Sequence, residues 1–576
     1  MTDTLLLTLP DSPAALRDAT WADLAPHYDA LAAAVDPGAG DPGWGARWLA
    51  TWSTLDALVS EAAAVSYWEY SRHTDDPVRE RRYLRWATEI GPELDEATTR
   101  LARRALALGL EAPGLGETLE NWRTDVQLFR EANKPRLAQV EEMSAEYDKL
   151  VGAMRVEWEG AQVPVMAVTQ HFHSPDRAVR ERAFVRHLAA YADARQEITG
   201  LYSRMVRLRG EIAREAGYPD YLRYRYAELH RREYGPEQAR AWCDAVEQAV
   251  VPAVERARAY RESRLGLRPL RPWDTAAPLF GAEPLVPYRG AEELVAGGER
   301  VLSAVDPFIG DVLRTMRREG LLDLDNREGK APGGYCTTFE VQGRSAIFMN
   351  AVGIADDVMT LFHEMGHALH HHLAARQPLV WTRHTGMEAA ELASMAMEML
   401  VRPHLGRPTG FYDARDAARA EYEHFEDILS YFPHFASVEL FQQWVYTAAD
   451  GAEPDAQDAA WLALRARFDR GSDWTGLDRI RAARWYRQSH ILQVPFYYIE
   501  YGIAQLGALQ VWRAARRDRQ GAVARYLEAL ALGGTVSLRD IYAAAGVRLI
   551  FDAAGMAELV AEVEQRLAEL REVLEA

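Results

Sequence analysis

The feature that most constrains this chain is a pair of histidines, His363 and His367, in the segment HEMGH. Residues four apart lie on one face of an α-helix, so both side chains can direct a ring nitrogen at the same metal ion. Glu364 follows the first histidine and can reach a water molecule on that ion without displacing the ligands. This spacing is typical of zinc hydrolases in which the glutamate is the general base. The motif therefore predicts a helix here and a metal-dependent hydrolase.

The residues around the motif predict that this helix is buried. Asp356 and Asp357 stand just before it, where an N-cap residue and first-turn acids are expected, and apolar residues recur at helical spacing over Val358–His372. A buried helix does not carry histidines without partners, because an unpaired polar group costs free energy in an apolar environment. The alternative, a helix that carries solvated histidines, is favoured only for His371 and His372.

A zinc site needs a third ligand, which is usually a histidine or a carboxylate. Residues 386–398 are rich in Ala and Met and predict a second buried helix. Its three acids, Glu388, Glu391 and Glu398, are unusual there because buried carboxylates need partners. Ligation of a metal, or a hydrogen bond to a ligand histidine, would provide such a partner. Glu391 and Glu398 are seven residues apart and lie on one face, whereas Glu388 fits best as a surface acid.

A β-type run at Arg344–Asn350 precedes the motif. A strand there could offer an unpaired edge to an extended peptide, and an ordinary core strand fits the same residues equally well. Cys336, a few residues earlier, is interpreted as a buried apolar residue rather than a nucleophile.

Length and patterning predict a mainly α-helical protein. The 576 residues are too many for one typical domain, helical periodicity dominates, and strand-like runs are few. We therefore expect two helical lobes with a small β element beside the helix that carries the motif.

Charge and cysteine content exclude several classes of protein. The chain has 66 basic and 85 acidic residues, a formal net charge of −19, which argues against nucleic acid as a partner. Two cysteines provide no disulfide framework, and the opening MTDTLLLTLPDSP lacks the basic start of a signal peptide. No segment approaches the ~18 apolar residues of a membrane span. We expect a cytoplasmic protein without membrane or nucleic-acid partners.

Several segments together resemble the oligoendopeptidase F branch of the thimet oligopeptidase family of zinc metallopeptidases. The resemblance is carried by HEMGHALH and the following AELASMAME, in which Glu391 occupies the place of the family's third zinc ligand. Other similar segments lie at residues 154–183, 267–279, 330–350, 490–501 and 530–547. The similarity covers residues 150–576 and implies a deep channel between the helical lobes, which admits short unstructured peptides.

The resemblance also assigns residues on the substrate side of the site. By position, His490, Tyr497 and Tyr501 match the family residues that contact the substrate backbone and stabilise the oxyanion formed during hydrolysis. Tyr498 is a further candidate. Ile499 stands where many relatives have another tyrosine, and the Gly-Gly pair that precedes the first tyrosine in thimet-type relatives is absent, so the hydroxyl that faces the oxyanion is left open.

These observations lead to a specific prediction. We expect an N-terminal helical region over residues 1–190, with a β-hairpin near residues 154–168, and a catalytic domain over residues 191–576. One zinc ion, which cobalt or manganese could replace, would be held by His363, His367 and Glu391. Glu364 would activate a zinc-bound water that attacks internal bonds of short unstructured peptides.

Two alternatives stay open. A related zinc carboxypeptidase or peptidyl dipeptidase would share the motif but would need a cation, such as Arg484 or Arg487, to fix the C-terminal carboxylate of its peptide. A non-catalytic peptide-binding protein would not need Glu364. The cleavage-site preference and the oligomeric state do not follow from the residues.

Overall fold

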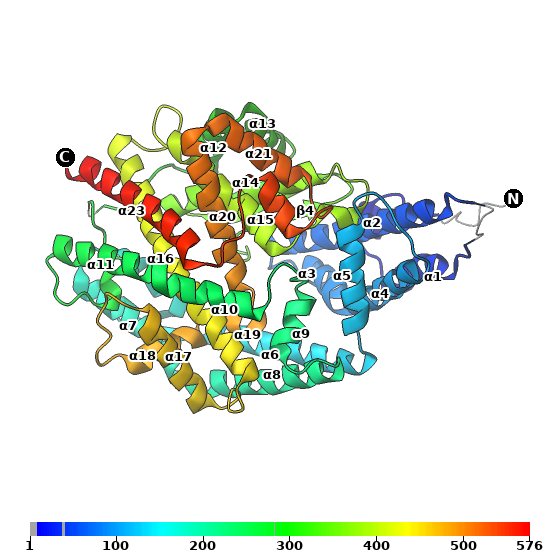
Figure 1. The fold of residues 1–576 in the computed structure, drawn as a ribbon, viewed down its shortest axis with the longest axis horizontal. Coiled ribbons are helices and arrows are strands. Elements are labelled where there is room, and N and C mark those ends of the chain that lie inside the picture. Colours follow the sequence, from blue (N-terminus) through cyan, green and yellow to red (C-terminus); the bar gives the residue numbers. More distant parts are fainter. Residues whose placement is uncertain (1–7, 37–40, 282) are drawn as a thin grey trace. The chain divides into compact units, whose positions relative to one another are not determined.

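The computed structural model describes residues 8–36, 41–281 and 283–576 (Figure 1). This part of the chain is mainly α-helical with two small sheets, as predicted. It forms two compact units: unit 1 lies within residues 1–127, 285–417 and 507–549, and unit 2 within residues 128–284, 418–506 and 550–576. The division at residue 190 is a different partition of the chain and stays a prediction, as does the deep channel.

Unit 1 contains the helix with the HEMGH segment. The α-helices of its described residues are α1 (Trp21–Ala33), α2 (Trp44–Ser71), α3 (Pro77–Leu84), α4 (Gly91–Ala107), α5 (Gly116–Leu128), α12 (Ala291–Val305), α13 (Pro307–Arg318), α14 (Ala355–Ala374), α15 (Met387–Val401), α21 (Arg519–Ala531) and α22 (Leu538–Ala544). The HEMGH segment lies in the middle of α14, and the predicted acidic helix is α15.

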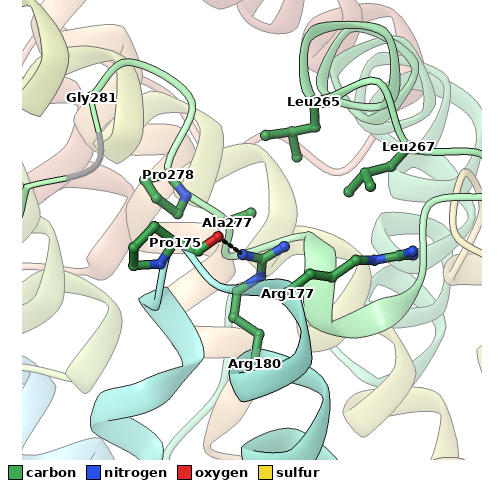
Figure 2. A pocket seen from close by; sticks show the side chains of 8 residues that line it. All are labelled: Pro175, Arg177, Arg180, Leu265, Leu267, Ala277, Pro278 and Gly281. Atoms are coloured by element: carbon green, nitrogen blue, oxygen red, sulfur yellow. Dashed lines mark hydrogen bonds between the residues drawn. The ribbon is translucent and has the colours of Figure 1, made fainter.

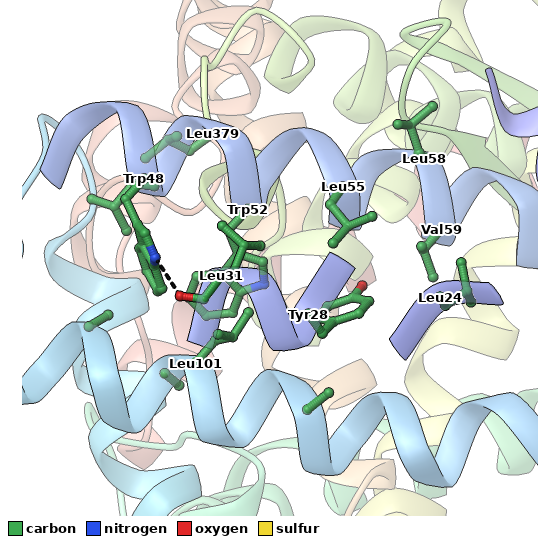
Figure 3. Packing of buried hydrophobic residues seen from close by; sticks show 14 of the residues in the cluster. Leu24, Tyr28, Leu31, Trp48, Trp52, Leu55, Leu58, Val59, Leu101 and Leu379 are labelled. Atoms are coloured by element: carbon green, nitrogen blue, oxygen red, sulfur yellow. Dashed lines mark hydrogen bonds between the residues drawn. The ribbon is translucent and has the colours of Figure 1, made fainter. Parts of the chain in front are cut away.

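A tryptophan-rich core holds the N-terminal helices of unit 1 together. Figure 3 shows Trp48 and Trp52 on α2, close to the apolar side chains of α1, and the indole N–H of Trp48 donates to the Leu31 carbonyl at 2.9 Å. The Trp52 ring lies 4.8 Å from that of Trp122 on α5 and 4.4 Å from that of Trp381. Because Trp381 belongs to the connection between α14 and α15, this core reaches the two helices expected to carry metal ligands.

A three-stranded sheet precedes α14. Its strands β3 (Leu322–Asp325), β4 (Tyr335–Phe339) and β5 (Arg344–Ala351) lie in the order β3-β5-β4, with β5 parallel to β3 and antiparallel to β4. The predicted strand is β5, and of the two alternatives for it the ordinary core strand is the one found: β5 is central and bonds to a strand on each side, so it offers no unpaired edge. The outer strands are β3 and β4.

Helix α2 supports both the sheet and the connection between α14 and α15. The buried Glu61 carboxylate accepts hydrogen bonds from the Gln342 backbone N–H at 3.1 Å and from its side-chain amide at 2.7 Å, in the turn between β4 and β5. Asp56 accepts a hydrogen bond from the Trp381 indole at 2.8 Å. Polar side chains of α2 therefore anchor both the β4–β5 turn and the connection that follows α14.

Unit 2 carries the remaining helices. Its described α-helices are α6 (Lys134–Ala153), α7 (Arg177–Asp193), α8 (Arg195–Glu215), α9 (Tyr221–Glu228), α10 (Pro236–Ala245), α11 (Val251–Leu265), α16 (Ala414–Thr447), α17 (Pro454–Phe468), α18 (Asp478–Tyr486), α19 (Ser489–Gln493), α20 (Tyr498–Arg517) and α23 (Ala553–Glu575). The first residues of α16 and the second half of α20 belong to unit 1.

The second sheet is a β-hairpin in unit 2, formed by β1 (Arg155–Trp158) and β2 (Ala161–Pro164). Its two turn residues, Glu159 and Gly160, have φ angles of 53° and 83°. Positive φ at both positions is typical of the type I′ turn, whose twist matches that of a two-residue hairpin. The hairpin falls within residues 154–168, where the sequence predicts one.

Two findings bear on the excluded classes of protein. Among the residues that the structure describes, no helix combines the length and the apolar character needed to cross a membrane. Cys243 and Cys336 are free thiols. Of the N-terminal segment assessed for a signal peptide, residues 1–7 lie outside the described residues.

Candidate active site

The start of α14 is held by a single carboxylate. Asp357 Oδ2 accepts hydrogen bonds from the backbone N–H groups of Val352, Gly353 and Ile354 at 2.9, 2.8 and 3.0 Å. Asp356 and Asp357 are both first-turn acids, and the N-cap position is Ile354. These three bonds fix the loop from β5 into α14 and so the direction in which the helix leaves the sheet.

The structure brings the three predicted metal ligands together in unit 1. The Oε2 atom of Glu391 lies 3.4 Å from His363 Nε2 and 3.8 Å from His367 Nε2, and the candidate ligand atoms all lie within 4.8 Å of one another. The two histidine side chains are 24% and 22% exposed, whereas that of Glu391 is 5% exposed. The two histidine rings are therefore partly exposed, whereas the carboxylate is buried.

Glu398 determines which nitrogen of His363 is free to bind a metal. Its Oε1 atom lies 2.7 Å from His363 Nδ1. An ionised carboxylate only accepts hydrogen bonds, so Nδ1 carries the proton and Nε2 keeps its lone pair. Ser394 Oγ donates to Glu391 Oε2 at 3.1 Å and orients that ligand as well. Two imidazoles and one carboxylate, with both kinds of ligand held by neighbours, fit a zinc ion.

Gly366, inside the HEMGH segment, permits α14 and α15 to approach closely. A Cβ atom at this position would lie 2.5 Å from the Ala393 carbonyl oxygen and 2.5 Å from Ser394 Cα. From α21, Tyr526 donates a hydrogen bond to the same Ala393 carbonyl at 2.7 Å. The absence of a side chain at Gly366 thus brings Glu391, one turn before Ser394, within reach of both histidines.

Glu364 is buried beside this cluster and forms no hydrogen bond with the described residues. Burial raises the pKa of its carboxyl to about 7, and the negative charges of Glu391 and Glu398 add to that shift. A cation held by the neighbouring ligands would lower this pKa again. The carboxylate is thus free of competing partners, as a proton acceptor must be.

Two further expectations about these helices are wrong. Glu388 is buried rather than a surface acid, and Tyr542 of α22 donates a hydrogen bond to its backbone carbonyl at 3.1 Å. His371 is buried rather than solvated, with Nε2 3.7 Å from Glu340 Oε1. Both errors have the same cause: segments distant in sequence cover these faces of α14 and α15. Cys336 is half-buried, and burial raises the pKa of its thiol, which fits its interpretation as a non-nucleophilic residue.

The residues expected on the substrate side form an aromatic cluster in unit 2. His490 lies on α19, and its ring centroid is 6.2 Å from that of Tyr497 and 6.4 Å from that of Tyr501. The two tyrosine rings are 5.2 Å apart. Tyr498, the weaker candidate, has its ring closest to the histidine, at 4.7 Å. The structure therefore brings the three predicted residues and Tyr498 together, and their roles stay predictions.

A strained residue sets the position of this cluster. Phe496 has a φ of 67°, in the left-handed region that costs a non-glycine residue on the order of 1 kcal/mol. Gln442 accepts a hydrogen bond from its N–H at 3.1 Å, and the guanidinium of Arg231 donates to its carbonyl while pairing with Glu500 at 2.6 Å. These buried partners stabilise the turn immediately before Tyr497. No local sequence pattern identifies this strain.

Cavities of unit 2 are lined by arginine side chains. The first, of about 310 Å³, is shown in Figure 2, where Arg180 donates a hydrogen bond to the Pro175 carbonyl at 3.0 Å. The second, of about 350 Å³, is lined in part by Arg484 and Arg487. Arg484 is already paired with Asp469 at 2.9 Å, whereas the Arg487 side chain forms no hydrogen bond or ion pair with the described residues. Of the two cations considered for a peptide carboxylate, only Arg487 is available.

Comparison with known proteins identifies relatives of this chain. The sequence model of peptidase family M3 matches residues 170–561 of this chain. A curated protein of Borreliella burgdorferi, named as an oligoendopeptidase F homolog, is 22% identical over 263 residues. That match spans 44% of this chain and 43% of the relative, so less than half of either protein is aligned.

Two solved structures share the fold over almost the whole chain. PZ peptidase A with an inhibitor is 24% identical, with a TM-score of 0.84 over 98% of this chain and 99% of that one. A Bacillus anthracis protein provisionally described as an oligoendopeptidase F is 22% identical, with a TM-score of 0.82 over 96% of each chain. At these identities the likeness establishes the fold.

Proposed function

Because this chain belongs to peptidase family M3, we propose that it is a zinc-dependent oligoendopeptidase that cleaves internal bonds of short, unstructured peptides. The observation that carries the proposal is the cluster of His363, His367 and Glu391, in which Glu398 holds the first histidine with Nε2 free. We also propose a cytoplasmic location, which the absence of a disulfide framework supports.

The metal would be held by the three residues of this cluster. A zinc ion there would supply Lewis-acid chemistry, which polarises a peptide carbonyl and lowers the pKa of a bound water. Glu398 would keep His363 in the ligating tautomer throughout turnover, because its carboxylate accepts the Nδ1 proton. Cobalt and manganese suit the same imidazole and carboxylate donors.

Glu364 would move the proton. As the water oxygen bonds to the carbonyl carbon, the Glu364 carboxylate accepts a proton from that water, and it then delivers this proton to the amine nitrogen as the C–N bond breaks. The negative charge that develops on the carbonyl oxygen needs hydrogen-bond donors, a role that we assign to His490, Tyr497 and Tyr501.

The sheet offers a way to bind main chain rather than side chains. β4 is an outer strand, and four of its five residues are half-buried. An extended peptide could add to this edge through backbone hydrogen bonds, which would make recognition tolerant of peptide sequence. We therefore expect β4, rather than the central β5, to contact the peptide.

The general-base role is tested with Glu364→Gln. This variant should retain zinc and the fold but lose activity by about 10³-fold or more, because no carboxylate remains to accept the proton. Asp356→Asn is a matched control, since it removes one charge from an exposed position on the same helix and should leave turnover unchanged. Wild-type turnover by Glu364→Gln in the presence of full zinc would refute the assignment.

The mode of cleavage is tested by incubating the zinc-loaded protein with a mixed peptide library and identifying products by mass spectrometry. Internal cuts support the proposal. Stepwise loss of C-terminal residues would instead favour the carboxypeptidase, and Arg487→Gln should then raise KM because that guanidinium is the available carboxylate partner. Intact peptides with zinc bound would favour a non-catalytic binding protein.

A further inference from the structure

We propose that Arg465, His434 and Gln488 form a hydrogen-bond relay that keeps the proton of His490 on Nε2. All four side chains belong to unit 2: Arg465 lies on α17, His434 on α16, and Gln488 directly before α19. The consequence for catalysis rests on the proposed function of His490, whereas the relay itself can be observed without turnover.

The first link determines the tautomer of His434. Arg465 is 2% exposed, and its Nη1 atom lies 3.4 Å from His434 Nδ1 and 2.9 Å from Ser437 Oγ. Asp469 accepts hydrogen bonds from the Nε and Nη2 sides of the same guanidinium and holds it in place. A guanidinium only donates, so His434 Nδ1 must accept. Burial, and then the charge of Arg465, keep the pKa of His434 well below its usual value, so this ring is neutral and its one proton is on Nε2.

The second link determines the orientation of the Gln488 amide. His434 Nε2 lies 3.0 Å from Gln488 Oε1, and the N–H that the first link places on this nitrogen requires an acceptor opposite it. The reverse orientation would set an NH₂ group against a ring N–H and lose the bond. The buried Gln488 side chain must therefore direct its NH₂ group towards His490, where Nε2 of the amide lies 2.8 Å from Nδ1 of the ring.

The third link determines the tautomer of His490. Its Nδ1 atom accepts from the amide, and burial lowers the pKa of the ring below its usual value, so the neutral imidazole carries its proton on Nε2. Within the described part of the chain the His490 ring makes no other hydrogen bond, so this N–H is available to a ligand. A donor is what a developing oxyanion needs, while the opposite tautomer would present a lone pair to it. Arg465, His434 and Gln488 are thus positioning residues.

Gln488→Glu tests the relay with almost no change in shape. A carboxylate at this position accepts from both rings, so it should draw the His490 proton to Nδ1 or leave the ring doubly protonated. We would label the zinc-loaded protein with ¹⁵N-histidine, assign the His490 signals by their loss in His490→Gln, and read the protonated nitrogen from long-range ¹H–¹⁵N spectra. The wild type should show a proton on Nε2 alone, whereas Gln488→Glu should show a proton on Nδ1. Gln170→Glu, at an exposed position in unit 2, is the matched control and should leave the His490 signals unchanged.

Kinetics supply the second readout. Gln488→Glu should lower kcat by about 10- to 100-fold, with zinc content and Tm close to those of the wild type, because one oxyanion donor is misdirected. A wild-type His490 protonated on Nδ1, or a tautomer unchanged in Gln488→Glu, would overturn the relay. Full activity in His490→Gln would instead refute the proposed role of His490 and leave the relay standing, so the two failures are distinguishable.

Discussion

Replacing Gly366 by alanine should damage both stability and metal binding, although alanine is the better helix former. The added Cβ would lie 2.5 Å from two backbone atoms of α15, and ordinary contact begins at 3.4 Å, so α15 would have to move by about 0.9 Å. Overpacking of this kind lowers the free energy of unfolding by roughly 1–3 kcal/mol, and the higher helix propensity of alanine offsets about 1 kcal/mol of that loss. We expect a net loss of up to about 2 kcal/mol in the free energy of unfolding.

The same movement carries Glu391 away from the histidines. Its Oε2 atom lies 3.4 Å from His363 Nε2, and metal–ligand distances tolerate deviations of only about 0.2 Å. A shift several times larger should weaken zinc binding by at least about tenfold, comparable with the loss of a group that orients a ligand. Zinc affinity would be measured by competition with a chelator, and stability by denaturant unfolding of the metal-free protein.

Gly200 on α8 provides the control, because a Cβ atom there would meet nothing within 4 Å. Gly200→Ala should raise the free energy of unfolding by up to about 1 kcal/mol and leave zinc affinity unchanged. If Gly366→Ala behaved in the same way, the close approach of α14 and α15 would not be what sets the geometry of the site.

Four further outcomes follow from the structure. Glu398→Gln keeps an acceptor for His363 Nδ1 but removes the charge, so zinc affinity measured by chelator competition should fall about 10- to 100-fold; an unchanged affinity would contradict the tautomer argument. Stripping zinc with a chelator should lower Tm, since zinc at a thousandfold excess over its Kd contributes ~4 kcal/mol to stability, and an unchanged Tm would argue against a bound ion. Burial raises the pKa of Asp56 from 3.8 to about 7, so the folded state binds this proton more tightly than the unfolded state. The wild type should therefore lose stability relative to Asp56→Asn between about pH 4 and pH 7, and a Tm difference that does not vary with pH would refute this. In the structure the Arg383 guanidinium lies 3.2 Å from the Glu340 carboxylate, and Glu340→Gln removes this charge partner. Urea unfolding should show a loss of ~3 kcal/mol in the free energy of unfolding, and an unchanged value would mean that water replaces the ion pair.

The grouping of His363 and His367 could be predicted because its information is local: helical periodicity decides which side chains of a helix share a face. Periodicity placed three acids on the following helix, and the family resemblance selected Glu391 among them as the expected third ligand. The mainly helical fold with a small sheet before α14 follows from similar short-range patterns. The family resemblance added residues such as His490, whose separation from the motif is too large for any spacing argument.

What could not be predicted depends on contacts between distant segments. The central position of β5 is decided by its pairing with β3 and β4, and the hydrophobic pattern of one strand does not reveal its neighbours. Local periodicity does not show which faces of a helix other elements cover, and it therefore wrongly places His371 and Glu388 in solvent. His434 belongs to no motif, and only the folded chain brings it between Arg465 and Gln488.

The anchoring of the α14–α15 connection by α2 limits how this protein can be divided. Ser53 Oγ accepts a hydrogen bond from the Val380 backbone N–H at 2.8 Å, beside the bond from Trp381 to Asp56. Helix α2 lies outside the residues that match the family, yet it holds the connection between the two helices that carry the proposed ligands. A fragment cut at the boundaries of the family match would keep every predicted catalytic side chain. It would lose the hydrogen bonds by which α2 holds the connection between α14 and α15. Chimeras that exchange only the matched segment should therefore bind zinc more weakly than chimeras that also receive α2.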